Sequence, residues 1–177
     1  MFRTALVYLP LSVIGLWRWS YWLIRITGAA LYRPPQVPWP SNRKRLKLSV
    51  VTPVYNEDHA LFIQVMESWI KNGVKEIIAV IDKTNTHLIV DFERYYSQHE
   101  DVKCRMIVTA KPGKRAALCD GIAMAEGDLI ALVDSDTVWD NKVVKKSLPY
   151  FLNPQIGAVT VAQRITNPNT MSNVLFD

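Results

Sequence analysis

The sequence predicts an α/β fold in which helices flank a mostly parallel sheet, preceded by an N-terminal membrane helix. Apolar runs of strand length alternate with helical patterns from residue 48 onward, and such alternation implies strands joined by right-handed crossovers. The first 32 residues differ in kind, because they hold many Trp and Tyr side chains among aliphatic ones and few charges. The chain has 177 residues, which suffices for one α/β domain and not for two.

The strands are expected where short apolar runs end in polar residues. The clearest run extends from Asp128 to Asp134 and is bounded by Gly127 and a charged turn, which is typical of a buried strand. Because parallel strands share one direction, their carboxyl ends meet at one edge, where open α/β sheets bind ligands. The predicted strands are 48–54, 76–82, 103–109, 128–134 and 156–163.

A helix is expected between each pair of consecutive strands. The first of these helices begins where Asn56 or Asp58 can cap its N-terminus. The third begins at Gly113, a residue that adopts many backbone conformations. The predicted helices are 58–71, 86–98, 113–125 and 142–151.

Residues 1–32 are predicted either to span a membrane or to lie along its interface as an amphipathic helix. A spanning helix needs about 20 apolar residues, whereas residues 5–16 supply 12 before Arg18. Arg18 and Arg25 share one helical face, flanked by aromatic side chains typical of the lipid interface. Residues 33–47 form a Pro-rich basic linker, and the positive-inside rule places the following domain on the cytoplasmic side of a plasma or inner membrane. Membrane lipid is therefore an expected partner.

Composition excludes two other classes of protein. Hydrophobic residues make up 49% of the chain and charged residues 21%, which excludes a disordered protein. The net charge of +5 is concentrated near the linker, so no nucleic acid is expected as a partner. Cys104 and Cys119 match no metal-binding or redox spacing, and both are expected to be reduced core residues.

The strand at 128–134 ends in two carboxylates, Asp134 and Asp136, separated by Ser135. Carboxylate oxygens at a sheet edge suit a hard divalent cation, Mg²⁺ or Mn²⁺, which keeps waters and is completed by substrate phosphates. A solvated acidic turn is the alternative, since turns of this kind are abundant. The pair alone does not decide between a metal site and a turn.

Polar residues at the other strand ends fit a nucleotide. Tyr55 offers a flat face for a base, and Asp82 can accept a hydrogen bond from a ligand N–H or a ribose hydroxyl. Lys111, Lys114 and Arg115 place three cations beside a helix N-terminus, where they oppose the helix dipole and so indicate a bound anion. Each motif also has an alternative interpretation. The loop around Tyr55 can be a plain turn that caps a helix, Asp82 can lie in a surface loop, and residues 111–115 can be a chance basic turn. Together with the paired carboxylates, these residues predict a site for a pyrophosphate, a metal and a nucleoside.

The motifs resemble those of the processive membrane glycosyltransferases of family 2, which include the hyaluronan, chitin and cellulose synthases. The likeness covers roughly residues 46–170, and Gly-Lys-Arg followed by Asp-Ser-Asp-Thr is most similar to hyaluronan synthase-like members. The resemblance implies a GT-A-like nucleotide-sugar-binding fold, of which residues 48–177 hold the donor-binding part. The matching pieces are Val51 to Glu57, Asp82, Lys111 to Arg115 and Val133 to Asp136.

The resemblance also implies an activity, the inverting transfer of a sugar from a UDP-sugar donor to a growing glycan acceptor with Mg²⁺ or Mn²⁺. It implies that Asp136 and Asp134 form the metal site, with Ser135 between them and Asp134 also near the ribose or the sugar. The other implied contacts are Thr52, Pro53, Tyr55, Glu57 and Asp82 around the uridine, and Lys111, Lys114 and Arg115 near the nucleotide and its phosphates.

Part of the reaction is left unassigned by the same resemblance. In the family, the general base is a carboxylate downstream of the Asp-x-Asp strand, and an acceptor-site Gln-x-x-Arg-Trp motif follows. Here 41 residues follow Asp136, and their acidic residues are Asp140, too close to match that base, and Asp177, the last residue. The catalytic base is therefore unknown, and the chain is expected to be a truncated form that holds the donor half of the site.

Three alternatives belong to other classes. A non-catalytic, membrane-tethered UDP-binding remnant or partner subunit would keep the donor site and transfer no sugar. A haloacid dehalogenase-like phosphatase fits Asp134 to Val138 but needs a Lys and acidic residues on later strands. A nicotinamide-binding Rossmann domain needs Gly-x-Gly-x-x-Gly after a strand, and the sequence has none. The sugar, the polymer and the oligomeric state are not determined by these residues.

Overall fold

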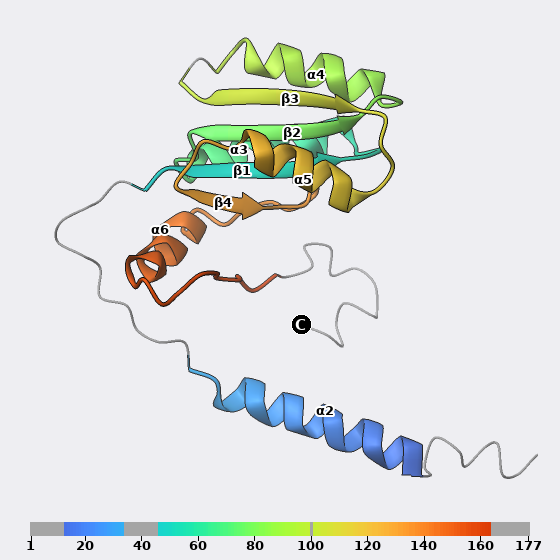
Figure 1. Ribbon diagram of the computed structural model, residues 1–177, viewed down its shortest axis with the longest axis vertical. Helices are drawn as coiled ribbons and strands as arrows, with labels where there is room; N and C mark the ends of the chain where they lie inside the picture. The colour runs from blue at the N-terminus through green and yellow to red at the C-terminus, as the bar shows by residue number, and fades with distance from the viewer. Residues whose placement is uncertain (1–12, 34–45, 100, 164–177) are drawn as a thin grey trace, which may run out of the picture. The chain divides into compact units, whose positions relative to one another are not determined.

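The computed structural model describes residues 13–33, 46–99 and 101–163 (Figure 1). The chain divides into two units between Val37 and Pro38. In the described residues, the first unit contains one helix and the second contains the sheet. Residues 34–45, most of the predicted linker, lie outside the described residues.

The first unit contains α2, a helix from Val13 to Leu31. Its large apolar side chains are exposed, with Trp17 at 76% and Trp19 at 64% exposure. The guanidinium carbon of Arg25 lies 5.7 Å from the ring centre of Tyr21, a cation–π contact. Within the described residues, no helix is both long enough and apolar enough to cross a membrane. The structure thus has a helix at Val13–Leu31, whereas residues 1–12 of the predicted segment lie outside the described residues. The contact of this helix with a membrane stays a prediction.

The strands of the second unit are β1 (Leu48–Val54), β2 (Glu76–Asp82), β3 (Lys103–Thr109) and β4 (Leu129–Leu132). Among the described residues they form one sheet in the order β3-β2-β1-β4, and every pairing is parallel (Figure 1). Val54 at the end of β1 pairs with Ile81, and Asp82 at the end of β2 pairs with Thr109. This confirms the predicted parallel sheet and aligns the carboxyl ends of its strands.

The helices are α3 (His59–Lys71), α4 (Thr86–Tyr96), α5 (Lys114–Met124), α6 (Val143–Ser147) and the short 3₁₀ helix η2 (Leu148–Leu152). The side chain of Asp58 accepts a hydrogen bond of 3.0 Å from the backbone N–H of Leu61 and so caps α3 at its predicted start. In Figure 1, α5 crosses one face of the sheet and α3 lies on the other. Both faces of the sheet are therefore covered in part by helices.

The main core lies between the sheet and the helices α3 and α4. Phe62 and Trp69 of α3 are fully buried against Val50 and Ile77 of the sheet. Full burial of such side chains contributes roughly 1.5–3 kcal/mol each. The ring of Trp139, which follows β4, is tilted against Trp69 with 6.2 Å between ring centres. The segment after β4 is thereby packed into the same core.

α5 approaches the other face of the sheet closely at Gly121. A Cβ atom at this position would lie 2.4 Å from Cγ1 of Val51 and 3.1 Å from Cγ2 of Val80. Glycine therefore lets the helix backbone reach these side chains without displacing them. This contact helps to set the position of α5, and with it the position of its N-terminus.

A buried carboxylate ties the opposite end of α5 to the sheet. Oε2 of Glu76 accepts hydrogen bonds from the Ser49 hydroxyl and, at 2.8 Å, from the backbone N–H of Glu126. The guanidinium of Arg105 donates to the Met124 carbonyl at 2.7 Å and pairs with the Glu126 carboxylate. A cation at a helix C-terminus is favourable because the last carbonyls carry partial negative charge. The network holds the C-terminal end of α5 at the amino ends of the strands.

Two predicted elements are wrong in whole or in part. Residues 156–163 form no strand, and none of the described residues pairs with the outer edge of β4 to make one. An apolar run becomes a strand only when a neighbouring strand accepts its hydrogen bonds. The helix predicted at 142–151 is shorter, because α6 ends at Ser147 and η2 continues to Leu152. Pro149 accounts for the change, since proline has no backbone N–H and crowds the preceding turn.

The two cysteines also differ from each other. Cys104 is buried on β3, as predicted, and burial raises the pKa of its thiol to about 11. Cys119 is exposed on α5, so its prediction as a core residue is wrong. Cys119 lies two residues before Gly121 on the helix, and residues so spaced face nearly opposite sides. Because Gly121 faces the sheet, the side chain of Cys119 points away from it.

We predict that Gly121→Val destabilises the fold by roughly 1–3 kcal/mol, because the new side chain must displace fully buried neighbours. The matched control is Ala123→Val, which adds the same side chain at an exposed position of α5 and changes stability by about 0.5 kcal/mol. Urea unfolding of the two variants measures both effects. Equal destabilisation at the two positions would contradict the close approach of α5.

A second prediction concerns acid stability. Hydrogen bonds from Lys103 and then Arg105 lower the pKa of Glu126 from 4.5 to about 2. Because the folded pKa is depressed, the stabilisation is complete above pH 4.5 and is lost as the pH falls towards 2. The stability difference between wild type and Glu126→Gln should therefore be largest near neutral pH and shrink in acid, which urea unfolding across that range measures. A difference that stays constant would show that the carboxylate makes no ion pair.

Candidate functional site

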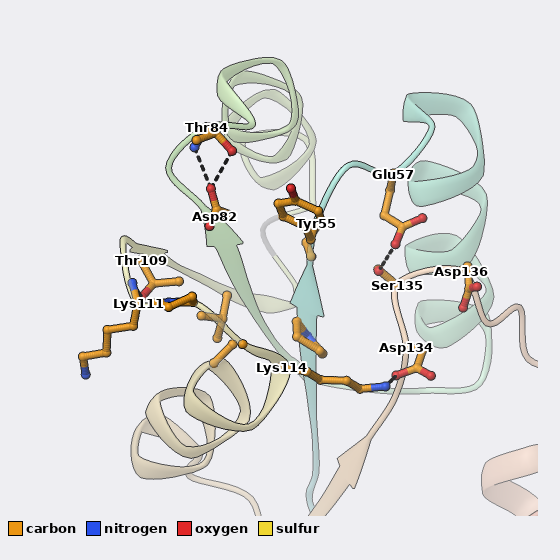
Figure 2. Close-up of a pocket in the computed structure, with 16 residues that line it drawn as sticks. Tyr55, Glu57, Asp82, Thr84, Thr109, Lys111, Lys114, Asp134, Ser135 and Asp136 are labelled. Atoms are coloured by element: carbon orange, nitrogen blue, oxygen red, sulfur yellow. Dashed lines mark hydrogen bonds and ion pairs between the residues drawn. The ribbon is translucent and has the colours of Figure 1, made fainter.

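The carboxyl ends of the strands and the N-terminus of α5 surround a pocket of about 640 Å³ (Figure 2). The parallel register accounts for its position, because Asp82 and Thr109 end neighbouring strands as a pair. The residues predicted for a nucleotide site line this pocket, with the exception of Thr52 and Arg115. Those that line it are Pro53, Tyr55, Glu57, Asp82, Lys111, Lys114, Asp134, Ser135 and Asp136.

The loop after β1 turns sharply at Asn56, whose φ of 54° lies in the left-handed region that asparagine adopts more readily than most residues. Tyr55 before the turn is 69% exposed at the end of β1, and Glu57 after it reaches towards Ser135 (Figure 2). The side chains of this loop therefore face different parts of the pocket.

Asp82 closes β2 in a tight turn. Its Oδ1 accepts hydrogen bonds from the backbone N–H of Thr84 at 2.9 Å and from the Thr84 hydroxyl at 2.6 Å. The hydroxyl, followed by the backbone N–H, lowers the pKa of the Asp82 carboxyl below its ordinary value. The side chain is therefore a fixed, negatively charged acceptor at the edge of the pocket.

The two lysines at the start of α5, Lys111 and Lys114, point in different directions. Gly113 has a φ of 104°, a conformation that L-residues avoid, and it lets the chain enter α5 directly at Lys114. Lys114 then reaches across the pocket and pairs with the carboxylate of Asp134 (Figure 2). Lys111 instead extends away from that carboxylate and pairs with Asp120 at 3.1 Å. Of the two lysines, Lys114 is the one that contacts the acidic turn, the segment from Asp134 to Thr137 after β4.

The turn after β4 presents two carboxylates with a buried hydroxyl between them. The backbone N–H of Thr137 donates to the Asp134 carbonyl at 3.1 Å and closes the turn. Ser135 is 4% exposed, and its hydroxyl donates to Oε1 of Glu57 at 2.7 Å. Asp134 and Asp136 on either side are exposed and line the pocket.

Asp134 and Asp136 are chemically suited to a hard divalent cation, since both present carboxylate oxygens at an open pocket. In the described part of the chain, no group of three or more His, Cys, Asp or Glu residues could hold a metal ion. The two carboxylates therefore fit a site that water and a bound ligand complete, rather than a closed site made by the protein alone.

Two residues predicted for the site lie outside the pocket lining. Thr52 is fully buried in β1 beside Ala79, a member of the core under α3 and α4. Its hydroxyl has no hydrogen-bond partner among the described residues. Arg115 follows Lys114 on α5 and is exposed. Adjacent residues of a strand or helix point in different directions, which explains why each lies beside a lining residue without being one.

Two lining residues with polar side chains, Thr84 and Thr109, were not predicted from the sequence. Thr84 holds Asp82, and Thr109 accepts a hydrogen bond of 3.1 Å from the backbone N–H of Lys111. For Thr84 a signal exists, because Asp-x-Thr after a strand is a pattern in which the acid binds the backbone two residues on. Thr109 carries no such local signal, since its place depends on the register of β3.

The fold and the pocket agree with one family of proteins. The model of the glycosyltransferase-like family 2 matches residues 45–177, and the chain belongs to this family. The predicted resemblance is thereby confirmed, hyaluronan synthase-like members included.

Named relatives of the chain are glycosyltransferases. An N-acetylglucosaminyltransferase from Azorhizobium caulinodans is 29% identical over 120 residues, covering 64% of this chain and 29% of the relative. A hyaluronan synthase from Streptococcus pyogenes serotype M3 is 27% identical over 148 residues, covering 80% of this chain and 34% of the relative. The chain thus spans about a third of the length of these two relatives.

A solved structure shows the same fold. The mannosyltransferase PcManGT from Pyrobaculum calidifontis, in complex with GDP-Man and Mn²⁺, superposes with a TM-score of 0.64 at 20% identity. The match covers 97% of this chain and 48% of that one. The predicted GT-A-like architecture is confirmed for the sheet and its helices.

We predict that Gly113→Ala destabilises the fold by about 1–3 kcal/mol, because a side chain at a φ of 104° is strained. The matched control is Gly157→Ala, where the added Cβ meets nothing within 4 Å and the backbone is unstrained. This control should be neutral or slightly stabilising in urea unfolding. Equal stability of the two variants would show that the entry to α5 is not fixed by Gly113.

Proposed function

We propose that the second unit is the donor-binding part of a polysaccharide-synthase-type glycosyltransferase, which uses a UDP-sugar and Mg²⁺ or Mn²⁺. The sugar is transferred to a growing glycan with inversion at the anomeric carbon. The observation that carries the proposal is the meeting of three kinds of group around one pocket: the acceptor Asp82 beside Tyr55, the cation of Lys114, and the carboxylates of Asp134 and Asp136.

The uracil base is proposed to bind at the ends of β1 and β2. Tyr55 exposes an aromatic ring there, on which a base can stack. Asp82 is held as a carboxylate by Thr84 and can accept a hydrogen bond from the N–H group of uracil. At that ring nitrogen uracil presents an N–H group, whereas cytosine presents an acceptor, so a carboxylate there favours uracil over cytosine.

The diphosphate is proposed to bind at the N-terminus of α5. The N-cap of this helix is Gly113, which has no side chain to cap the first amides, so these amides and the helix dipole can attract an anion. Lys114 adds a positive charge at the same place, and its ammonium pairs with the carboxylate of Asp134. On donor binding we expect Lys114 to exchange part of this contact for a phosphate oxygen, which leaves Asp134 available at the turn.

The carboxylates of Asp134 and Asp136 are the proposed ligands of the divalent cation. Their hard oxygens and their open position suit Mg²⁺ or Mn²⁺, with the diphosphate and water filling the other positions. When bound, the ion would neutralise negative charge on the departing UDP. We also propose that Asp134, which pairs with Lys114, contacts the ribose or the sugar.

The chain supplies the donor half of the reaction in this proposal. Inverting transfer requires an acceptor hydroxyl to attack the anomeric carbon from the face opposite the diphosphate, while a base takes its proton. The described residues provide the groups that bind and orient the leaving nucleotide. We assign the catalytic base to none of them.

The donor site is proposed to lie at a membrane. α2 exposes tryptophan and tyrosine side chains along its length, and such aromatic side chains are typical of the lipid–water interface. The basic residues within 33–47 support a cytoplasmic position for the domain by the positive-inside rule. Membrane lipid is accordingly a proposed partner of the first unit.

Calorimetric titration of the detergent-solubilised chain with UDP tests the donor site. We predict binding that is strengthened by Mn²⁺ and weakened roughly tenfold or more in Asp136→Ala, because a charged ligand group is lost. Glu93→Ala removes an exposed carboxylate on α4, outside the pocket, and should leave binding unchanged.

Two results would contradict the proposal. A folded wild-type chain that binds neither UDP nor GDP with Mn²⁺ would exclude a donor site in this pocket. Equal binding by wild type and Asp136→Ala, with and without Mn²⁺, would exclude the metal assignment while leaving nucleotide binding in place.

A further inference from the structure

Glu57 lines the pocket, yet its contact is not the one expected of a residue that surrounds the uridine. Its Oε1 accepts a hydrogen bond of 2.7 Å from the hydroxyl of Ser135. Figure 2 shows Glu57 and Ser135 facing each other on the side of the pocket where Asp136 lies, whereas Asp82 lies beyond Tyr55. The position of Glu57 therefore relates it to the acidic turn rather than to the base.

Ser135 is the one residue of the acidic turn that points into the protein. It is 4% exposed, while Asp134 and Asp136 are exposed on either side of it. A buried hydroxyl without a hydrogen-bond partner destabilises the folded protein. The inward position of Ser135 therefore requires a hydrogen-bond acceptor next to its hydroxyl. While Ser135 is held inward, its two neighbours are kept at the surface of the pocket.

The chain holds Glu57 in place from both sides. Before it, Asn56 adopts a left-handed conformation with a φ of 54°. After it, Asp58 caps α3 through the backbone N–H of Leu61. A carboxylate acceptor makes a stronger hydrogen bond than a neutral one, which suits a contact between two separate loops.

We propose that Glu57 is a positioning residue, which holds Ser135 inward and thereby fixes Asp134 and Asp136 at the pocket, and which does not contact the nucleotide. This inference rests on the proposed function, because it takes the acidic turn as the metal site. It assigns Glu57 a different role from the uridine contact that the family resemblance implies.

Three substitutions separate the two roles. Glu57→Ala removes the acceptor, Ser135→Ala removes the donor, and Glu57→Gln keeps a side-chain oxygen that can still accept from Ser135. A positioning role predicts that Glu57→Ala, Ser135→Ala and the double variant each weaken Mn²⁺-dependent UDP binding by roughly threefold to tenfold. The double variant should be no weaker than either single variant, and Glu57→Gln should stay within about twofold of wild type.

The binding of each ligand alone gives a sharper readout. Mn²⁺ titration followed by electron paramagnetic resonance, without nucleotide, should show the same loss in Glu57→Ala and Ser135→Ala. UDP titration without metal should be unchanged in both. The matched control is Glu67→Ala, which removes an exposed glutamate of α3 that pairs with Lys71 and lies outside the pocket lining.

A direct nucleotide contact predicts the opposite pattern. In that case Glu57→Ala and Glu57→Gln weaken UDP binding without metal, and Ser135→Ala has no effect. That pattern, or additive effects of the two alanine substitutions, would overturn the positioning role.

Failure of the proposed function can be told apart from failure of this inference. The same variants form a double-mutant cycle in urea unfolding, which needs no ligand. If wild type binds no UDP, the donor site is refuted. A coupling free energy between Glu57 and Ser135 in the unfolding cycle would still support the claim that Glu57 holds Ser135 inward. Absence of coupling in a folded chain would overturn the inference whatever the binding result.

Discussion

The parallel pairing of β1 with β2 on one side and with β4 on the other is the constraint on which the pocket depends. Because the strands share one direction, their carboxyl ends meet at a single edge, and polar residues that are distant in the sequence become neighbours. Tyr55, Asp82 and Asp134 are brought together in this way. The close approach of α5 at Gly121 adds Lys114 to the same edge.

The two ends of the sheet use polar groups differently. At the amino ends, Oε2 of Glu76 accepts hydrogen bonds from Ser49 and the backbone of Glu126, and Oε1 of Glu76 lies 3.5 Å from the guanidinium of Arg105, so the charge of this carboxylate is paired within the scaffold. At the carboxyl ends, Asp82 and Asp136 present carboxylates to an open pocket. Carboxylates gathered at one edge are stabilised by a bound cation, and the proposed Mg²⁺ or Mn²⁺ meets that condition. Lys114 at the same edge supplies a positive charge for the proposed diphosphate.

Much of the fold was predictable from the sequence, because apolar runs and turn residues mark the elements directly. The strand at 76–82 and the helix after Asp58 were placed correctly for this reason. The family resemblance placed Thr52 around the uridine, whereas the structure buries this residue in the core. The pattern of β1 could not show its direction, since a strand that is apolar on both faces has no alternation. The hydrogen bond between Glu57 and Ser135 joins two loops that only the folded sheet brings together. No local sequence pattern predicts this hydrogen bond.

The most direct test of the donor site is a crystal structure of the chain with UDP and Mn²⁺, in which anomalous scattering locates the metal. The proposed site predicts a manganese peak beside Asp134 and Asp136, a diphosphate at the N-terminus of α5 and a uracil ring near Tyr55 and Asp82. A manganese peak at another place, or UDP bound outside this pocket, would contradict the assignment.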